Sequence, residues 1–136
     1  MPARILAAGS MTRAGLAALL LLAAPLLNGC GGGNKAGEAD GLAYKPIAPD
    51  VFAVVIDPKI DVPKAEAAFR KYCDDRPSCT IYGWTNPADV APTAPLDDRH
   101  YQSLAVRYVA HAIGTDDMMW DCLRFLKARA PCLPKA

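Results

Sequence analysis

The sequence lacks the motifs on which the best-known enzyme classes depend. It contains only two histidines, His100 and His111, and neither a G-x-S-x-G nor an H-E-x-x-H pattern. Its consecutive glycines, Gly31 to Gly33, lie in a polar stretch and not in a phosphate-cradling loop. The familiar patterns of serine hydrolases, zinc proteases and P-loop proteins are therefore missing, and no cofactor is expected.

The sequence also lacks an apolar run long enough for a permanent membrane span. Its main run covers residues 14–27, follows Arg4 and Arg13, and contains Pro25. A helix needs roughly 20 apolar residues to cross the hydrocarbon core. A charged start followed by a shorter apolar run is typical of a secretory signal peptide, which we place at residues 1–29.

The end of this run, Leu27-Asn28-Gly29-Cys30, resembles the lipobox of bacterial lipoproteins. The resemblance implies cleavage before Cys30, acylation of its thiol (a palmitate-type anchor), and a membrane lipid as a partner. Position 31 is Gly and not the Asp of an inner-membrane retention signal, so the resemblance implies an outer-membrane anchor facing the periplasm. An ordinary secretory signal with an unrelated cysteine is the alternative.

Charge of one sign is not in excess in the predicted mature chain. Removal of residues 1–29 takes away two of 15 basic residues, which leaves 13 against 14 acidic residues. Nucleic-acid binding needs a strongly basic surface, so a nucleic-acid partner is not expected.

The mature chain divides into a tether and a domain. Residues 30–46 are rich in glycine and polar residues, which predicts a lipidated cysteine followed by a flexible tether. Residues 47–136 then form one small globular domain.

Within the domain, apolar periodicity predicts alternating strands and helices. We expect a strand at 51–56, a helix that begins after Asp61, and a strand at 79–84. A second helix is expected from Asp97 or Asp98 to Gly114, because its apolar residues follow helical spacing: Tyr101, Leu104, Ala105, Tyr108, Val109 and Ala112. The last segment favours a strand around Trp120 and a stapled tail, with a helix capped by Thr115 as the alternative. The predicted fold class is α/β or α+β: a β-α-β-α-(β) domain with a short sheet and two packed helices.

Four cysteines remain once Cys30 is assigned to lipid. An even number in an oxidising compartment favours disulfides, which allow three pairings. Pairing of neighbours closes the shortest loops and is preferred: Cys73 with Cys79 and Cys122 with Cys132. The spacings do not match a redox C-x-x-C pair or a common zinc site.

Three groups of residues are candidate sites. His100 with Asp97 or Asp98 could form an acid/base or metal cluster, although these aspartates also suit a helix cap. His111 would lie about 16 Å away on the same predicted helix, too far to share a metal with His100. A second acidic cluster consists of Asp116, Asp117 and Asp121, and we interpret it as a solvated turn or helix start.

The third group is the proline-rich segment after the second predicted strand. Its members are Trp84, Pro87, Pro92 and Pro95. A restricted apolar loop loses little entropy on binding, so this is the predicted contact surface for an envelope protein. The sequence thus favours a membrane-anchored lipoprotein of the cell envelope, a non-enzymatic binding or structural domain. The alternative is a small hydrolase or metal-binding protein that uses His100, and a third hypothesis is disulfide exchange.

Overall fold

The computed structural model describes residues 37–136; the predicted signal peptide, Cys30 and the first residues of the tether lie outside this range. The described residues form one six-stranded sheet in which spatial order follows chain order. The strands are β1 (Gly37–Ala39), β2 (Leu42–Ala48), β3 (Val51–Val55), β4 (Ser78–Trp84), β5 (Val106–His111) and β6 (Asp117–Trp120). The helices are α1 (Val62–Cys73), a 3₁₀ turn η1 (Pro87–Asp89) and α2 (Asp98–Gln102).

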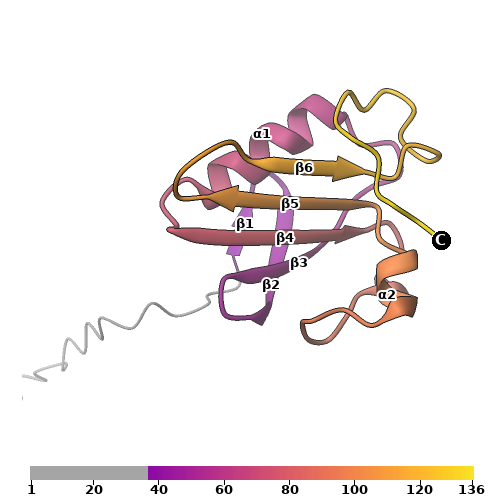
Figure 1. Ribbon diagram of the computed structural model, residues 1–136, viewed down its shortest axis with the longest axis horizontal. Helices are drawn as coiled ribbons and strands as arrows, with labels where there is room; N and C mark the ends of the chain where they lie inside the picture. The colour runs from indigo at the N-terminus through magenta and orange to yellow at the C-terminus, as the bar shows by residue number, and fades with distance from the viewer. Residues whose placement is uncertain (1–36) are drawn as a thin grey trace, which may run out of the picture. The chain divides into compact units, whose positions relative to one another are not determined.

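The sheet is mixed because one connection differs from the others. Strands β3 and β4 are parallel, and α1 forms the crossover between them. The remaining neighbours are antiparallel pairs. In Figure 1, α1 crosses one side of the sheet, and α2 lies beyond the arrowhead of β4 and the start of β5. A parallel pair needs such a crossover, whereas antiparallel neighbours can be joined by short turns.

The face of the sheet under α1 holds the main hydrophobic core. Phe69 of α1 is 0% exposed, and its ring lies 6.3 to 6.5 Å from those of Tyr44, Tyr108 and Trp120. Strands β2, β5 and β6 supply these three rings. Burial of one such side chain stabilises the fold by about 1.5–3 kcal/mol. Phe69 therefore packs α1 against β2, β5 and β6.

The opposite face carries a second, smaller core. It consists of Ile47, Ala53, Trp84, Ala91, Leu104 and Leu133. The proline-rich segment and the C-terminal tail cover it, with Val90, Ala94 and Leu96 packed against it. The segment between β4 and α2 is therefore part of the fold and not a free connection.

The predicted second long helix is wrong. Helix α2 ends at Gln102, and the residues that were expected to continue it form β5. Val106 and Tyr108 point to the core while Arg107 and Val109 are half-buried, so the same apolar residues also fit an alternation of period two. Pairing with β4 and β6 supplies backbone hydrogen bonds on both sides, and this long-range pairing decides between the two periods.

The predicted fold class is consequently wrong as well. The described residues contain a sheet-dominated domain with a single long helix and not a β-α-β-α domain with two packed helices. The expected placement of His100 and His111 on one helix is also wrong, because His100 lies in α2 and His111 ends β5.

The folded domain begins earlier than predicted. Residues 37–48, mostly assigned to the tether, form β1 and β2. Leu42 and Tyr44 are buried, and the Tyr44 ring stacks on Tyr72 at 3.8 Å. Asp40 and Gly41 both have positive φ, 54° and 78°, as a tight two-residue hairpin requires. The glycines that precede residue 42 favoured a tether, although residues 42–48 contain no glycine and begin with alternating buried and exposed side chains.

Four other expectations are confirmed. The strands predicted at 51–56 and 79–84 are β3 and β4, and the helix after Asp61 is α1. The terminal element is strand β6 followed by a disulfide-closed tail, and not a helix capped by Thr115.

Candidate functional site

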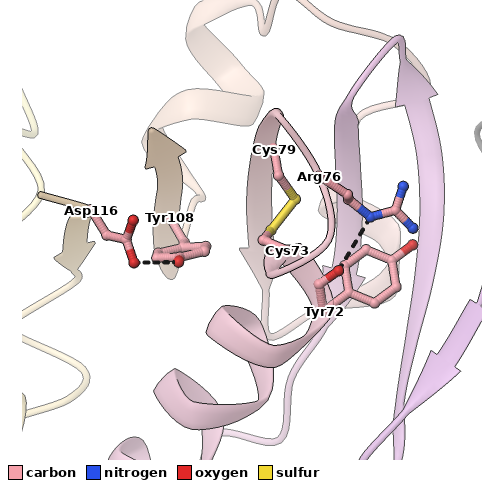
Figure 2. The surroundings of a disulfide bond; sticks show 6 residues. All are labelled: Tyr72, Cys73, Arg76, Cys79, Tyr108 and Asp116. Atoms are coloured by element: carbon pink, nitrogen blue, oxygen red, sulfur yellow. Dashed lines mark hydrogen bonds between the residues drawn. A yellow bond between two sulfur atoms is a disulfide. The ribbon is translucent and has the colours of Figure 1, made fainter. Parts of the chain in front are cut away.

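Two disulfides are present, and both join neighbouring cysteines. Cys73 at the end of α1 bonds to Cys79 at the start of β4, with their Cα atoms 5.6 Å apart (Figure 2). Cys122 bonds to Cys132, with Cα atoms 5.4 Å apart. These bonds account for four of the five cysteines, and Cys30 is the fifth.

A polar cavity of about 610 Å³ lies beside the first disulfide. The end of α1, the following turn and the outer half of β5 surround it. Its charged and polar lining residues are Arg70, Asp74, Asp75, Arg76, Tyr108, His111 and Asp116. Cations and carboxylates therefore face the same space, without a serine, threonine or free thiol among the lining residues.

Tyr108 and Asp116 form a hydrogen bond in the lining of this cavity. The Tyr108 hydroxyl donates to Oδ2 of Asp116 at 2.6 Å, as Figure 2 shows. Burial raises the pKa of Tyr108 above its usual range, and the bond to Asp116 raises it further. Tyr108 thus stays protonated near neutral pH, with its hydroxyl proton donated to Asp116.

Arg76 is held on the other side of the disulfide turn. Its Nε donates to the Tyr72 carbonyl oxygen at 3.2 Å, and its guanidinium lies 4.7 Å from the centre of the Tyr72 ring (Figure 2). The guanidinium also lies 4.8 Å from the centre of the Phe52 ring. Stacking of this kind fixes the direction of the side chain. Arg76 therefore places a fixed cation at the rim of the cavity.

The structure brings His100 and Asp97 together as the start of α2. Oδ1 of Asp97 accepts from the His100 backbone N–H at 2.8 Å and lies 2.6 Å from His100 Nδ1. The backbone hydrogen bond, followed by the side-chain one, lowers the pKa of Asp97. Asp98 is exposed and does not join them. Among residues 37–136, no group of three or more His, Cys, Asp or Glu side chains could hold a metal ion. The contact is thus a helix cap.

The second acidic cluster is dispersed in the structure. Asp116 binds Tyr108, Asp117 pairs with Arg107 at 3.5 Å, and Asp121 binds Lys135 at 2.7 Å. Each carboxylate has a different partner, so the three do not converge on one cation.

Trp84 does not belong to a contact surface. Its side chain is 0% exposed, and Nε1 donates to the His100 carbonyl oxygen at 3.0 Å. Pro87, Pro92 and Pro95 are exposed. Trp84 therefore packs under the proline-rich segment on the side of the sheet, and the three prolines lie on the side of the segment that faces solvent.

Sequence reasoning did not predict the cavity, because its lining comes from α1, β5 and the turn before β6. The alternation of Tyr108 and Ala110 was the available signal, and helical spacing masked it.

No helix among residues 37–136 is long and apolar enough to span a bilayer. No protein-family model matches the chain, and neither a curated protein nor a solved structure shows significant similarity to it.

Proposed function

We propose that the chain is a lipoprotein of the cell envelope, anchored through an acylated Cys30 to the outer membrane and facing the periplasm. Its domain binds another envelope component and does not catalyse a reaction. The resemblance of Leu27 to Cys30 to a lipobox supports the anchor. The two disulfides agree with an oxidising compartment.

One observation carries the binding function: the proline-rich segment is held rigidly while its outer side is free. Ala91 is 1% exposed and packs in the second core, whereas Pro87, Pro92 and Pro95 face solvent. A segment already fixed in shape loses little conformational entropy when a partner binds. These three prolines form the proposed contact surface.

The anchor is tested by intact mass and by membrane fractionation. We expect a mass that corresponds to cleavage before Cys30, added acyl chains and the loss of four cysteine hydrogens in two disulfides. The Cys30→Ser variant should lack the acyl chains and should leave the membrane fraction on a high-salt wash, whereas the parent should stay. An unmodified Cys30 in the mature protein would overturn this part of the proposal.

The contact surface is tested by photo-crosslinking in cells. A photoreactive residue at Thr93, exposed between two of the prolines, should give a discrete adduct. The same residue at Ala67, exposed on α1, serves as the matched control. Equal adduct patterns from both positions would contradict a specific surface on the proline-rich segment.

A second candidate, metal binding or hydrolysis through His100, rests on the contact between His100 and Asp97 at 2.6 Å. Such a site requires that His100→Ala weakens Zn²⁺ binding while His111→Ala does not. We expect equal Zn²⁺ affinities for both variants. Selective loss in His100→Ala, with the fold unchanged by circular dichroism, would favour this second candidate.

A further inference from the structure

The segment after β6 presents leucine side chains to solvent. In this C-terminal loop, residues 122–132, Leu123 and Leu126 are 90% and 85% exposed. Phe125, between them in sequence, is 4% exposed, and its ring packs against Trp120 at 4.9 Å. Because Phe125 anchors the loop to the core, the two leucines are held outward by the fold.

Both ends of the C-terminal loop are attached to the sheet. The Cys122–Cys132 disulfide closes it. The Trp120 backbone N–H donates to the Pro131 carbonyl at 3.0 Å, and the Leu133 N–H donates to the Trp120 carbonyl at 2.8 Å. The loop lies beyond the arrowhead of β6 in Figure 1. Its shape is therefore set before any binding partner arrives.

The charge of this region has one sign. No residue from 122 to 136 is acidic, and the basic residues are Arg124, Lys127, Arg129 and Lys135. Arg124 and Lys135 pair with Asp121. Lys127 and Arg129 are exposed and form no ion pair within the described residues.

A third basic side chain from another part of the chain adjoins the loop. A cavity of about 520 Å³ separates the loop from the start of α1, and Lys59 lines it together with Arg124 and Lys127. Asp61 is the single carboxylate in its lining. Positive charge thus collects at the end of a domain whose overall charge is near zero.

We propose that the C-terminal loop is a membrane contact in its own right, made with a bilayer that contains anionic phospholipid. Leu123 and Leu126 enter the headgroup interface, and Lys127 and Arg129 bind lipid phosphates. Apolar side chains beside basic ones are the combination with which interfacial segments bind anionic membranes. This contact does not depend on the lipid on Cys30.

A bilayer fits this surface better than a protein partner. The exposed apolar area of the loop is limited to two leucines, whereas a stable protein interface buries about 800 Å² on each partner. A few apolar side chains beside basic ones suffice for insertion into the headgroup interface, and a lipid tether would strengthen this contact further by raising the local concentration of the loop at the membrane.

The test places a fluorescent reporter in the loop of the full chain carrying Cys30→Ser. Trp84 and Trp120 are both 0% exposed, so their emission is a constant background. Leu126→Trp should show a blue shift, and quenching by brominated lipid, with vesicles of equal parts phosphatidylcholine and phosphatidylglycerol. Vesicles of phosphatidylcholine alone should have little effect.

Ile113→Trp is the matched control, because Ile113 is 95% exposed in the turn at the other end of β6, close to Asp116 and Asp117. It should show no shift, and this separates insertion of the loop from binding through the N-terminal apolar run. Equal shifts for the two reporters, no shift for Leu126→Trp, or equal shifts with neutral and anionic vesicles would each overturn the proposal.

Charge variants test the electrostatic part. In the Leu126→Trp chain, Lys127→Gln with Arg129→Gln should weaken partitioning of the protein onto anionic vesicles about 25-fold. Each basic residue near an anionic surface contributes about five-fold to binding, and two are removed. Lys45→Gln with Arg99→Gln changes the net charge equally at exposed positions on β2 and α2 and should have a much smaller effect. Equal losses in both pairs would show a non-specific charge effect and contradict a contact through the loop.

Discussion

Asp121 organises the C-terminal tail, and its neutralisation should destabilise the domain in a pH-dependent way. Its side chain is 9% exposed, accepts from Lys135 Nζ at 2.7 Å and from the Leu123 N–H at 3.2 Å, and pairs with Arg124 at 3.8 Å. Burial raises the pKa of Asp121, but the bond to Lys135 and its charge, with the Leu123 N–H, outweigh burial and lower it overall. The carboxylate therefore stabilises the folded state.

Asp121→Asn keeps the shape of the side chain and removes the charge. A hydrogen bond to a charged group contributes about 1.5–3 kcal/mol, and Lys135 is 22% exposed, so we expect a loss of about 2 kcal/mol at pH 7. Because the folded pKa is lowered, this contribution is present above the unfolded pKa of about 3.9 and is lost as the pH falls through the folded value. The difference from the parent should therefore shrink at acidic pH.

The assay is urea unfolding at pH 7 and near pH 3, with disulfides intact, followed by the fluorescence of Trp84 and Trp120. Asp117→Asn is the matched control, because Asp117 pairs with Arg107 at 3.5 Å and its side chain is 35% exposed. An exposed pair of this kind contributes about 0.2–1 kcal/mol. Equal losses for both variants, or a loss in Asp121→Asn that persists at acidic pH, would refute the reasoning.

Three further predictions concern packing and cross-links. Gly83→Ala would place a Cβ atom 2.5 Å from Val106 Cγ1, so we expect a loss of about 1–3 kcal/mol in urea unfolding, partly relieved when Val106→Ala is added; strictly additive losses would contradict this overlap. Replacement of Cys122 and Cys132 by alanine removes a cross-link with a sequence separation of 10 residues and should lower the free energy of unfolding by about 3 kcal/mol, and an unchanged value would show that the tail is stable without it. The buried Tyr44 hydroxyl has no hydrogen-bond partner among the described residues. Tyr44→Phe should therefore raise the free energy of unfolding by about 1 kcal/mol, and a lower value than in the parent would mean that the hydroxyl has a hydrogen-bond partner.

The elements that local signals predict correctly are those with a single consistent pattern. The run from Val51 to Ile56 is apolar and β-branched throughout and does not fit another element, and α1 combines Asp61 with a clear apolar stripe. The pairing of neighbouring cysteines followed in the same way from short loop closure. In each case the signal that predicts the element lies within a few residues along the chain, although β3 itself also pairs with the distant β4.

The misassigned strand β5 depends on a distant partner, β4. Tyr108 and Val109 fit a helix and a strand equally well, and hydrogen bonds from β4 and β6 select the strand. Strand β2 is a different case, because Leu42 pairs with Ala39 of β1 and Tyr44 pairs with Val54 of β3, both of which are neighbouring strands in the chain. What holds for β5 also holds for the candidate contact surface. Trp84 is buried because the proline-rich segment covers it, and the local sequence does not show this.

By itself, the sequence determined the signal-like start, the lipobox resemblance, the even set of cysteines after Cys30 and the near-neutral charge of residues 30–136. These are properties of composition and of spacing over a few residues. Only the tertiary structure decided the six-stranded sheet, the cavity beside Cys73 and Cys79, and the outward leucines of the C-terminal loop. Each of these depends on which distant segments share backbone hydrogen bonds and a core, and local periodicity does not contain that information.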